Sequence, residues 1–202
     1  MHSRLPLSFY KQEDVVQIAR DLLGKFLMTN IGDEGVTGGM IVETEAYAGA
    51  LDKASHAYGN RKTPRTQIMY EEGGVAYVYF IYGFHHLFNV ITNHAHIPQA
   101  VLIRAIEPIE GIDLMLKRRG MQFVERKLTA GPGVLCKALG ITKEQNGLSL
   151  MEDIVWIEDR NVRVSNKNII AGPRVNVSYA GDDALLPYRF MIKGNNWVSK
   201  RW

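Results

Sequence analysis

The 202-residue sequence has the composition of an ordinary soluble globular protein, with 46% hydrophobic and 22% charged residues. Its formal net charge of +3 permits a polyanionic partner but is too small to argue for one alone. The N-terminal segment lacks the apolar run of a signal peptide, and no stretch reaches the roughly 20 apolar residues that cross a bilayer. The single cysteine, Cys136, excludes an intrachain disulfide and a four-thiolate metal site.

The predicted elements begin with an amphipathic helix at residues 12–23, whose apolar residues recur at helical spacing up to Gly24. Strand-like runs rich in β-branched and aromatic residues follow, at residues 25–29, 39–47, 75–81, 87–92 and 100–106. Because proline suits a first helical turn and glycine suits a stop, two more helices are predicted, at 107–120 and 131–139. Three further strands are expected at 154–157, 174–179 and 188–193.

The order of these elements favours an α+β fold. Strands arrive in runs without a helix after each one, so we expect a single domain over residues 1–202, with a curved mixed or antiparallel β-sheet surrounded by helices and a protruding β-hairpin. A doubly wound parallel sheet is less compatible with this order. The two glycine-rich phosphate motifs, GxGxxG and GxxxxGK[ST], are absent, which weakens the case for a nucleotide cofactor.

The protruding hairpin is predicted around residues 82–85, YGFH, where glycine allows a tight reversal between two strands. Tyr77, Tyr79 and Ile81 then share one face, and Tyr82 lies at the tip. Most tyrosines in a sheet simply pack and find hydrogen bonds. An aromatic ring at an exposed tip also suits a wedge between DNA bases, and ring faces suit base stacking. The pattern alone leaves both interpretations open.

The motif IVETEAY, in the strand at 39–47, places Glu43, Glu45 and Tyr47 on one face if the alternation is regular. Two such carboxylates can bind a metal, act as a general acid and a general base, or form a solvated face. Asp52 and His56 follow, but no recognised metal-ligand spacing is present, so we expect no metal. A carboxylate held beside apolar and aromatic groups can serve as a general base.

Positive charge occurs at two unusual places. Arg104 lies inside the apolar run AVLIRAI and needs a buried partner, usually a carboxylate, in either a structural or a functional ion pair. The predicted loop at 61–66, RKTPRT, combines positive charges with hydroxyl groups. Such a loop is either a solvated turn or a contact with phosphate oxygens, made here by Arg61, Thr63 and Arg65.

Together these motifs resemble the alkyladenine (3-methyladenine) DNA glycosylases, also called methylpurine DNA glycosylases, and in particular a compact bacterial member. The matching motifs are IVETEAY with His56, GNRKTPR, YVYFIYGFHHLFNV, VLIRAIEP, GPGVLCKALGI and RFMIKGNNWVS. They run in the family's order over nearly the whole chain from about Phe9 onward. The resemblance implies a monofunctional base-excision repair enzyme that flips a damaged purine from duplex DNA and hydrolyses its N-glycosidic bond, with no metal, other cofactor or lyase step.

The resemblance also implies the catalytic residues. Glu45 matches the general base that activates the attacking water, and Arg104 and the backbone carbonyl of Val198 match the groups that hold this water. We expect Glu43 to be structural, and a β-bulge would break the alternation that places it beside Glu45.

The expected contacts with DNA come from the same comparison. Tyr47, His56 and Tyr79 match the residues that sandwich the flipped base, and Asn89 matches the asparagine that disfavours normal guanine. Tyr82 matches the tyrosine that fills the gap left in the duplex. The expected partner is double-stranded DNA containing damaged purines, bound by a monomer in the cytoplasm and on the nucleoid.

Two other functions remain open at this point. One is a module that binds damaged DNA without cutting it, with Glu45 and Arg104 as no more than a buried pair. The other is a hydrolase of free nucleosides, for which an exposed Tyr82 would have no purpose. Next to Tyr82, the residues Phe84, His85 and His86 depart from the mammalian family members, which leaves the range of lesions open.

Overall fold

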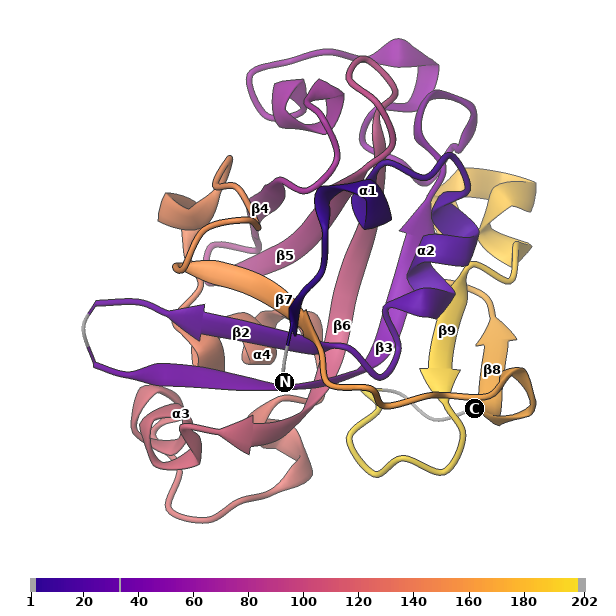
Figure 1. Cartoon of the computed structure of the whole chain (residues 1–202). Helices are drawn as coiled ribbons and strands as arrows, with labels where there is room; N and C mark the ends of the chain where they lie inside the picture. The colour runs from indigo at the N-terminus through magenta and orange to yellow at the C-terminus, as the bar shows by residue number, and fades with distance from the viewer. Residues whose placement is uncertain (1–2, 33, 200–202) are drawn as a thin grey trace.

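The computed structural model describes residues 3–32 and 34–199, which Figure 1 shows arranged around one open β-sheet. Within these residues nine strands form the sheet in the order β1-β7-β2-β3-β6-β5-β4, while β9 pairs with β3 and β8. All the pairings are antiparallel. The strands are β1 (Ser3–Arg4), β2 (Phe26–Asn30), β3 (Val36–Tyr47), β4 (Ala76–Ile81), β5 (His85–Thr92), β6 (Gln99–Glu110), β7 (Val155–Asp159), β8 (Ile169–Gly172) and β9 (Arg189–Ile192).

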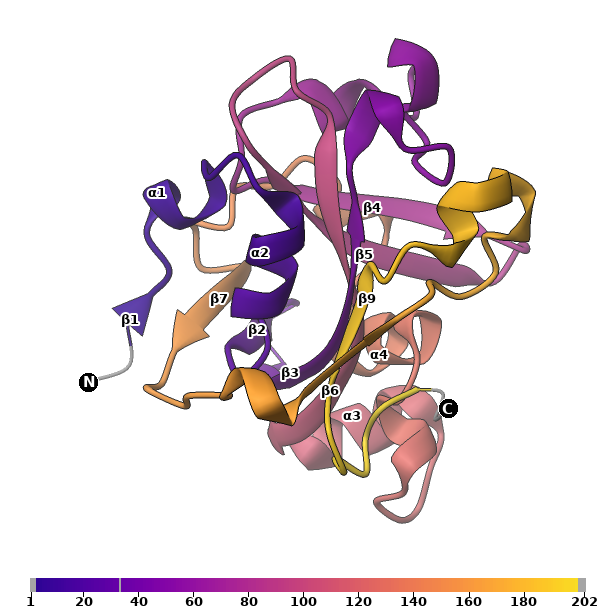
Figure 2. The ribbon, with the colours of Figure 1, turned by 90° about the vertical axis from the view of Figure 1, so that its right-hand side faces the viewer.

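Helices cover both faces of the long strands. The α-helices of the described residues are α1 (Leu7–Tyr10), α2 (Val15–Asp21), α3 (Ile112–Arg119) and α4 (Pro132–Leu139). Helix α2 packs against β3 and β6, and α4 packs against β5 and β6; Figure 2 shows the two helices on opposite sides of β6. None of the helices in the described ranges is long and apolar enough to cross a membrane. The architecture confirms the predicted α+β fold with an antiparallel sheet.

Helix α2 is shorter than the predicted segment because Asp14 caps its first turn. The Asp14 carboxylate accepts hydrogen bonds from the backbone amides of Val16 at 2.9 Å and Gln17 at 3.1 Å. Ile18 and Ala19 have no exposed surface and pack towards the sheet. The apolar spacing therefore identified the buried face, while the cap sets where the helix begins.

The pairing of β3 with β6 is irregular around Glu43. Its register shifts between Ile41 and Glu43 and again between Glu43 and Thr44, as a β-bulge does. Thr44 still faces α2, where its hydroxyl donates to the carbonyl of Ala19 at 2.7 Å. Glu43 and Glu45 lie on the opposite face, since both contact Arg104.

The helix predicted to open at Glu107 and Pro108 is wrong over its first part. Strand β6 continues through Pro108 to Glu110, because these residues pair with Gly39 and Gly38 of β3. Strands β3 and β6 approach closely here because Gly39 has no side chain: a Cβ atom at this position would lie 2.2 Å from the carbonyl oxygen of Glu107. Helix α3 begins only after Gly111, whose φ of +68° turns the chain out of the strand.

The strand predicted at 174–179 is also wrong. This segment is irregular and leads into a 3₁₀ helix at Ser178–Leu185. Arg174 is buried and donates to the carbonyl of Ala46 at 2.9 Å and to Asp52 at 2.8 Å, so its side chain replaces strand pairing as the anchor. Strands β1 and β8 and the short helix α1 were not predicted, because segments of two to four residues carry too little periodicity.

The predicted β-hairpin is present and consists of β4 and β5. Tyr82 lies at its tip with 72% of its surface exposed, and Phe84 is 68% exposed. Both Tyr82 and Gly83 have positive φ angles, +55° and +76°, which a tight reversal uses and which a tyrosine rarely adopts. Figure 2 shows the hairpin projecting past the body of the sheet.

Candidate active site

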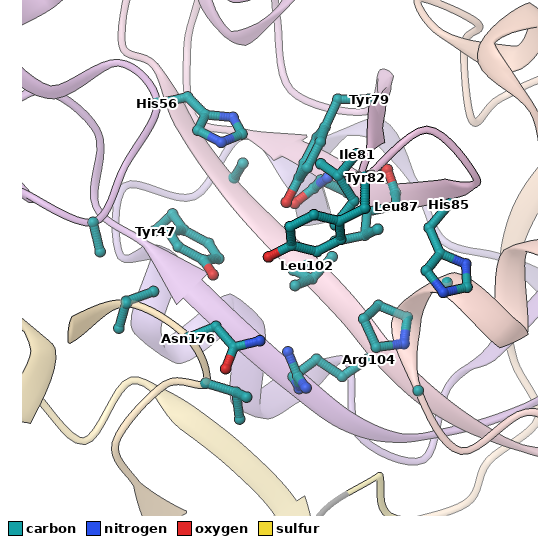
Figure 3. Close-up of a pocket in the computed structure, with 18 of the residues that line it drawn as sticks. Tyr47, His56, Tyr79, Ile81, Tyr82, His85, Leu87, Leu102, Arg104 and Asn176 are labelled. Carbon is teal, nitrogen blue, oxygen red and sulfur yellow. Dashed lines mark hydrogen bonds between the residues drawn. The ribbon is translucent and has the colours of Figure 1, made fainter. Parts of the chain in front are cut away.

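A cavity of about 410 Å³ opens beside the hairpin. Its walls come from the end of β3, from β4, β5 and β6, from residues 130–134 at the start of α4, and from residues 175–179. Figure 3 shows the side chains of this lining around the open space. It includes six of the residues predicted from the sequence: Tyr47, His56, Tyr79, Tyr82, Asn89 and Arg104.

Glu45 lies directly behind this lining, with no exposed surface. Its Oε1 atom accepts a hydrogen bond from the Val175 backbone amide at 2.7 Å, and the Arg104 Nη1 atom lies 3.4 Å from the same oxygen. The Tyr47 hydroxyl donates to the other oxygen, Oε2, at 2.9 Å. All three of these groups line the cavity, so only they separate the Glu45 carboxylate from a molecule bound there.

Arg104 joins Glu45 to Glu43. The Arg104 Nε atom donates to Glu43 at 3.0 Å, and Arg189 donates to the same oxygen at 2.7 Å. Ser199 adds two more donors to Glu43, its hydroxyl at 2.9 Å and its backbone amide. Burial acts to lower the pKa of Arg104, but the carboxylates of Glu45 and Glu43 outweigh it and raise the pKa above the ordinary value.

Tyr47 covers Glu45 on the cavity side. Burial, followed by the negative charge of Glu45, raises the pKa of Tyr47 well above its ordinary value of 10. The phenol therefore stays protonated and donates to the carboxylate. The guanidinium of Arg174 lies 4.9 Å from the centre of the Tyr47 ring and supports it from behind.

Three rings form the opposite wall of the cavity. The Tyr79 ring lies 4.7 Å from that of His56 and 5.3 Å from that of Tyr77. The His56 Nδ1 atom is 3.0 Å from the Tyr77 hydroxyl, which fixes the orientation of the imidazole. Tyr77 was missed as a site residue, although its position on the same strand face as Tyr79 was a usable signal. The cavity is thus lined by aromatic rings on two sides, with an ion pair at its floor.

His56 is held in its neutral form. Burial, together with the positive charges of Arg65 and Arg61, lowers its pKa from 6.5 to about 4. At neutral pH the ring therefore carries no charge that would repel a cationic ligand in the cavity.

This shift predicts how stability depends on pH. Above pH 6.5 His56 is neutral in both the folded and the unfolded chain, whereas between pH 6.5 and about 4 only the unfolded chain takes up the proton. We expect the free energy of unfolding to fall by about 3 kcal/mol over this range because of His56. Chemical denaturation of the wild type and of His56→Gln at several pH values measures the difference.

His86→Gln is the matched control, because its imidazole is more exposed and burial and Lys143 lower its pKa less strongly. We expect this variant to keep most of the wild-type pH dependence. An unchanged pH dependence in His56→Gln would contradict the assignment of a neutral, buried His56.

Asn89 lies on the cavity wall formed by β5. Its side-chain Nδ2 donates to the carbonyl of Tyr77 at 3.1 Å, and only 3% of the residue is exposed. This hydrogen bond holds the side-chain amide against β4. Its orientation is set by the β4–β5 pairing, since Asn89 and Tyr77 are direct partners in the ladder.

Other predicted residues lie outside the cavity lining. Val198 is buried, and its carbonyl accepts a hydrogen bond from the Arg126 Nε atom at 3.0 Å. Arg61 and Arg65 are exposed on the loop beside His56, and the Arg65 guanidinium lies 5.0 Å from the Tyr79 ring. Thr63 contacts Thr66 within this loop, with 3.1 Å between the hydroxyls. The loop thus borders the aromatic wall from outside.

Two further residues of the lining, Asn176 and Tyr179, were not predicted, because the segment that holds them was read as a strand. Among residues 3–32 and 34–199, no group of three or more histidine, cysteine, aspartate or glutamate side chains is arranged to hold a metal ion.

Comparison with known proteins places these features in a family. Residues 8–196 match the family described as methylpurine-DNA glycosylase (MPG). A protein of Clostridium novyi (strain NT), provisionally named a 3-methyladenine DNA glycosylase, is 45% identical over 205 residues that cover 98% of this chain and 99% of the relative. A protein of Bacillus mycoides (strain KBAB4) with the same provisional name is 47% identical over 203 residues, covering 96% of this chain and 98% of the relative.

Proposed function

The chain belongs to the methylpurine-DNA glycosylase family and so is an N-glycosyl hydrolase of DNA, and we propose that it flips alkylated or deaminated purines out of the duplex and releases them as free bases. One observation supports this most directly: the buried carboxylate of Glu45, with Arg104, lies at the floor of an aromatic-walled cavity beside an exposed aromatic hairpin tip. We further propose that the 202 residues act as one domain and as a monomer.

The hairpin carries the first step of the proposal. Tyr82 enters the duplex from the tip of the hairpin and fills the space that the flipped nucleotide leaves, while Arg61, Thr63 and Arg65 contact phosphate oxygens. Flipping costs a few kcal/mol, and less at a damaged or mispaired base, so selection begins before the base reaches the cavity.

The cavity then holds the purine between Tyr47 on one side and His56 and Tyr79 on the other. Alkylation of a ring nitrogen makes the purine electron-poor and positively charged, so it stacks well on electron-rich phenol faces. The neutral state of His56 avoids charge repulsion with such a base. Asn89, fixed by its bond to Tyr77, lies where it can crowd the exocyclic amine of normal guanine.

Glu45 performs the chemical step. It takes a proton from a water molecule, the water oxygen forms a bond to C1′ of the sugar, and the bond between C1′ and the purine nitrogen breaks. For an alkylated purine, the electron pair of that bond goes to the purine and neutralises its positive charge. A neutral purine such as hypoxanthine receives the same electron pair, leaves as an anion and takes up a proton from solvent. The carboxylate also stabilises the positive charge that develops on the sugar. Arg104 holds the water near Glu45 and keeps the carboxylate in place.

The activity is proposed to be monofunctional. A lyase step needs an amine nucleophile, usually a lysine, and no lysine lies among the described residues that line the cavity. Single-turnover assays on duplexes that each carry one 3-methyladenine, 7-methylguanine, hypoxanthine or ethenoadenine test the proposal. Free base should be released from at least one of them, and the DNA strand should stay intact until it is heated with alkali. Tight binding without release would instead indicate a non-catalytic damage-binding module, and release from free nucleosides alone would indicate a nucleosidase.

Replacing Tyr82 by alanine should weaken binding to the lesion duplex by roughly tenfold to a hundredfold, because stacking of one base on an aromatic ring contributes about 1–3 kcal/mol. Fluorescence anisotropy with a labelled duplex measures the affinity. Phe123→Ala is the matched control, since Phe123 is 71% exposed but does not line the cavity. Equal affinities of Tyr82→Ala and the wild type would rule out the wedge.

A further inference from the structure

A buried ion pair of Arg174 and Asp52 lies behind Tyr47, the ring that borders the cavity in Figure 3. The two residues are 5% and 3% exposed, and neither is part of the cavity lining. The Nη2 atom of Arg174 donates to Oδ1 of Asp52 at 2.8 Å, and Nη1 donates to Oδ2. This bidentate pairing is among the strong arrangements of a guanidinium with a carboxylate, and it holds both groups in place.

The guanidinium of Arg174 packs against the face of Tyr47 that is turned away from the cavity. Its central carbon lies 4.9 Å from the centre of the Tyr47 ring and 5.3 Å from that of Tyr188. A cation on one face of an aromatic ring is attracted by the same π electrons that attract a second cation on the other face. An unbalanced charge at Arg174 would therefore weaken the stacking of a positively charged purine on Tyr47, both through the ring and by repulsion across it.

Asp52 supplies the balancing negative charge at hydrogen-bond distance from the guanidinium. Its carboxylate also accepts hydrogen bonds from the backbone amides of Ala48 at 3.0 Å and Ala54 at 2.9 Å, which anchors the turn after Tyr47. An asparagine at this position could accept one of these bonds through its side-chain oxygen. It could not neutralise Arg174, so the charge of Asp52 has a consequence that the anchoring of the turn does not explain.

We propose that the charge balance between Asp52 and Arg174 determines how well the cavity accepts positively charged purines relative to neutral ones. Asp52 cancels the positive charge behind Tyr47 and so allows an alkylated, cationic base to stack on this ring. Both residues then determine specificity from outside the cavity, by acting through Tyr47. This inference rests on the proposed function, since it concerns the base that is flipped into the same cavity.

The test compares the affinities for two duplexes, one with a single 7-methylguanine, which is cationic, and one with a single hypoxanthine, which is neutral. All proteins carry Glu45→Gln so that the base stays attached, and fluorescence anisotropy measures binding. Asp52→Asn leaves the guanidinium unbalanced and should lower the ratio of the two affinities on the order of tenfold, because charges act strongly through a buried site. Arg174→Gln leaves the carboxylate unbalanced and should raise the ratio. The double variant removes both charges and should return the ratio to nearly the value without either change.

Asp159→Asn is the matched control. Asp159 also forms an ion pair, with Lys25 at 2.6 Å, and its replacement changes the net charge of the protein by the same amount. Neither residue of this pair lines the cavity. The control should therefore keep the ratio, and a shift as large as that of Asp52→Asn would overturn the inference by showing an effect of net charge alone.

The opposite signs separate an effect of charge from a loss of structure. A lowered ratio in both Asp52→Asn and Arg174→Gln would overturn the inference, because a displaced Tyr47 disfavours cationic bases in either variant. An unchanged ratio in Asp52→Asn would also overturn it. If Asp52→Asn does not fold, Arg174→Gln is compared with the double variant, and equal ratios in these two would contradict the inference. Base release by the protein with Glu45 intact tests the proposed function separately, and if no lesion duplex is bound more tightly than an undamaged one, both fail.

Discussion

Replacing Glu45 by glutamine is expected to reduce base release by roughly 10³-fold or more, because removal of a general base commonly costs 10²–10⁴-fold and the same carboxylate stabilises the developing charge on the sugar. Glutamine keeps the size of the side chain and an oxygen that can accept from the Val175 amide, whose distance is 2.7 Å in the wild type. It cannot take a proton from water at neutral pH. The rate is measured in a single turnover with enzyme in excess over a lesion duplex.

The loss should lie in the chemical step alone. Glu45 has no exposed surface and lies behind Tyr47, so the variant should bind the lesion duplex with an affinity close to that of the wild type. Glu110→Gln provides the control, because Glu110 is exposed at the end of β6 and lies outside the cavity lining. It should release base normally. Release by Glu45→Gln at a rate near that of the wild type would remove Glu45 from its proposed role.

The location of the proposed catalytic pair could be predicted because each of its two members stands out within its own strand. Glu45 and Arg104 are charged residues inside long apolar strands, and a buried charge needs a partner of opposite sign. Such a partner must come from a neighbouring strand, and β3 and β6 are indeed neighbours. Because side chains alternate along a strand, Tyr77 and Tyr79 were expected on the same face of β4, and both line the cavity. Only Tyr79 was predicted as a site residue.

The two wrong secondary-structure predictions, the helix from Glu107 and the strand at 174–179, concern segments whose conformation depends on contacts with distant parts of the chain. Nothing near Pro108 in the sequence shows that Gly38 and Gly39 make room for β6 to continue beyond it. The segment from Arg174 does not form the predicted strand, because Arg174 is held by an ion pair with Asp52, which lies more than a hundred residues earlier in the sequence. Residues 175–179 then border the cavity, so the place of Asn176 and Tyr179 in its lining could be found only from the fold.

The four buried charges at the floor of the cavity form one unit. Glu43 and Glu45 balance Arg104 and Arg189, and each interior charge has a partner of opposite sign within 3.4 Å. Glu45 is the member that contacts cavity-lining groups on three sides, whereas Glu43 accepts from Arg104, Arg189 and Ser199 behind it. This difference supports the proposal that Glu45 performs the chemical step and that Glu43 holds the site in place.

Glu43→Gln should therefore destabilise the protein more than it slows the reaction. Removing one partner of a buried ion pair typically costs 3–5 kcal/mol, and Glu43 is shared by two guanidinium groups. Denaturant unfolding should show a loss of about this size. Because Arg104 keeps its contact with Glu45, base release measured below the lowered melting temperature should exceed that of Glu45→Gln by at least tenfold.

The two variants separate a supporting carboxylate from a second working one. If Glu43 only supports the site, Glu43→Gln lowers the free energy of unfolding more than it lowers the rate of base release. The rate that remains then reflects how far Arg104 moves from Glu45 in the variant. If Glu43 took part in the chemistry, Glu43→Gln would lose base release as fully as Glu45→Gln while still binding the duplex normally. That result would contradict a supporting role for Glu43. The geometry argues against it, since two of the groups that donate to Glu43, Arg189 and Ser199, do not line the cavity, whereas all three groups that contact Glu45 do.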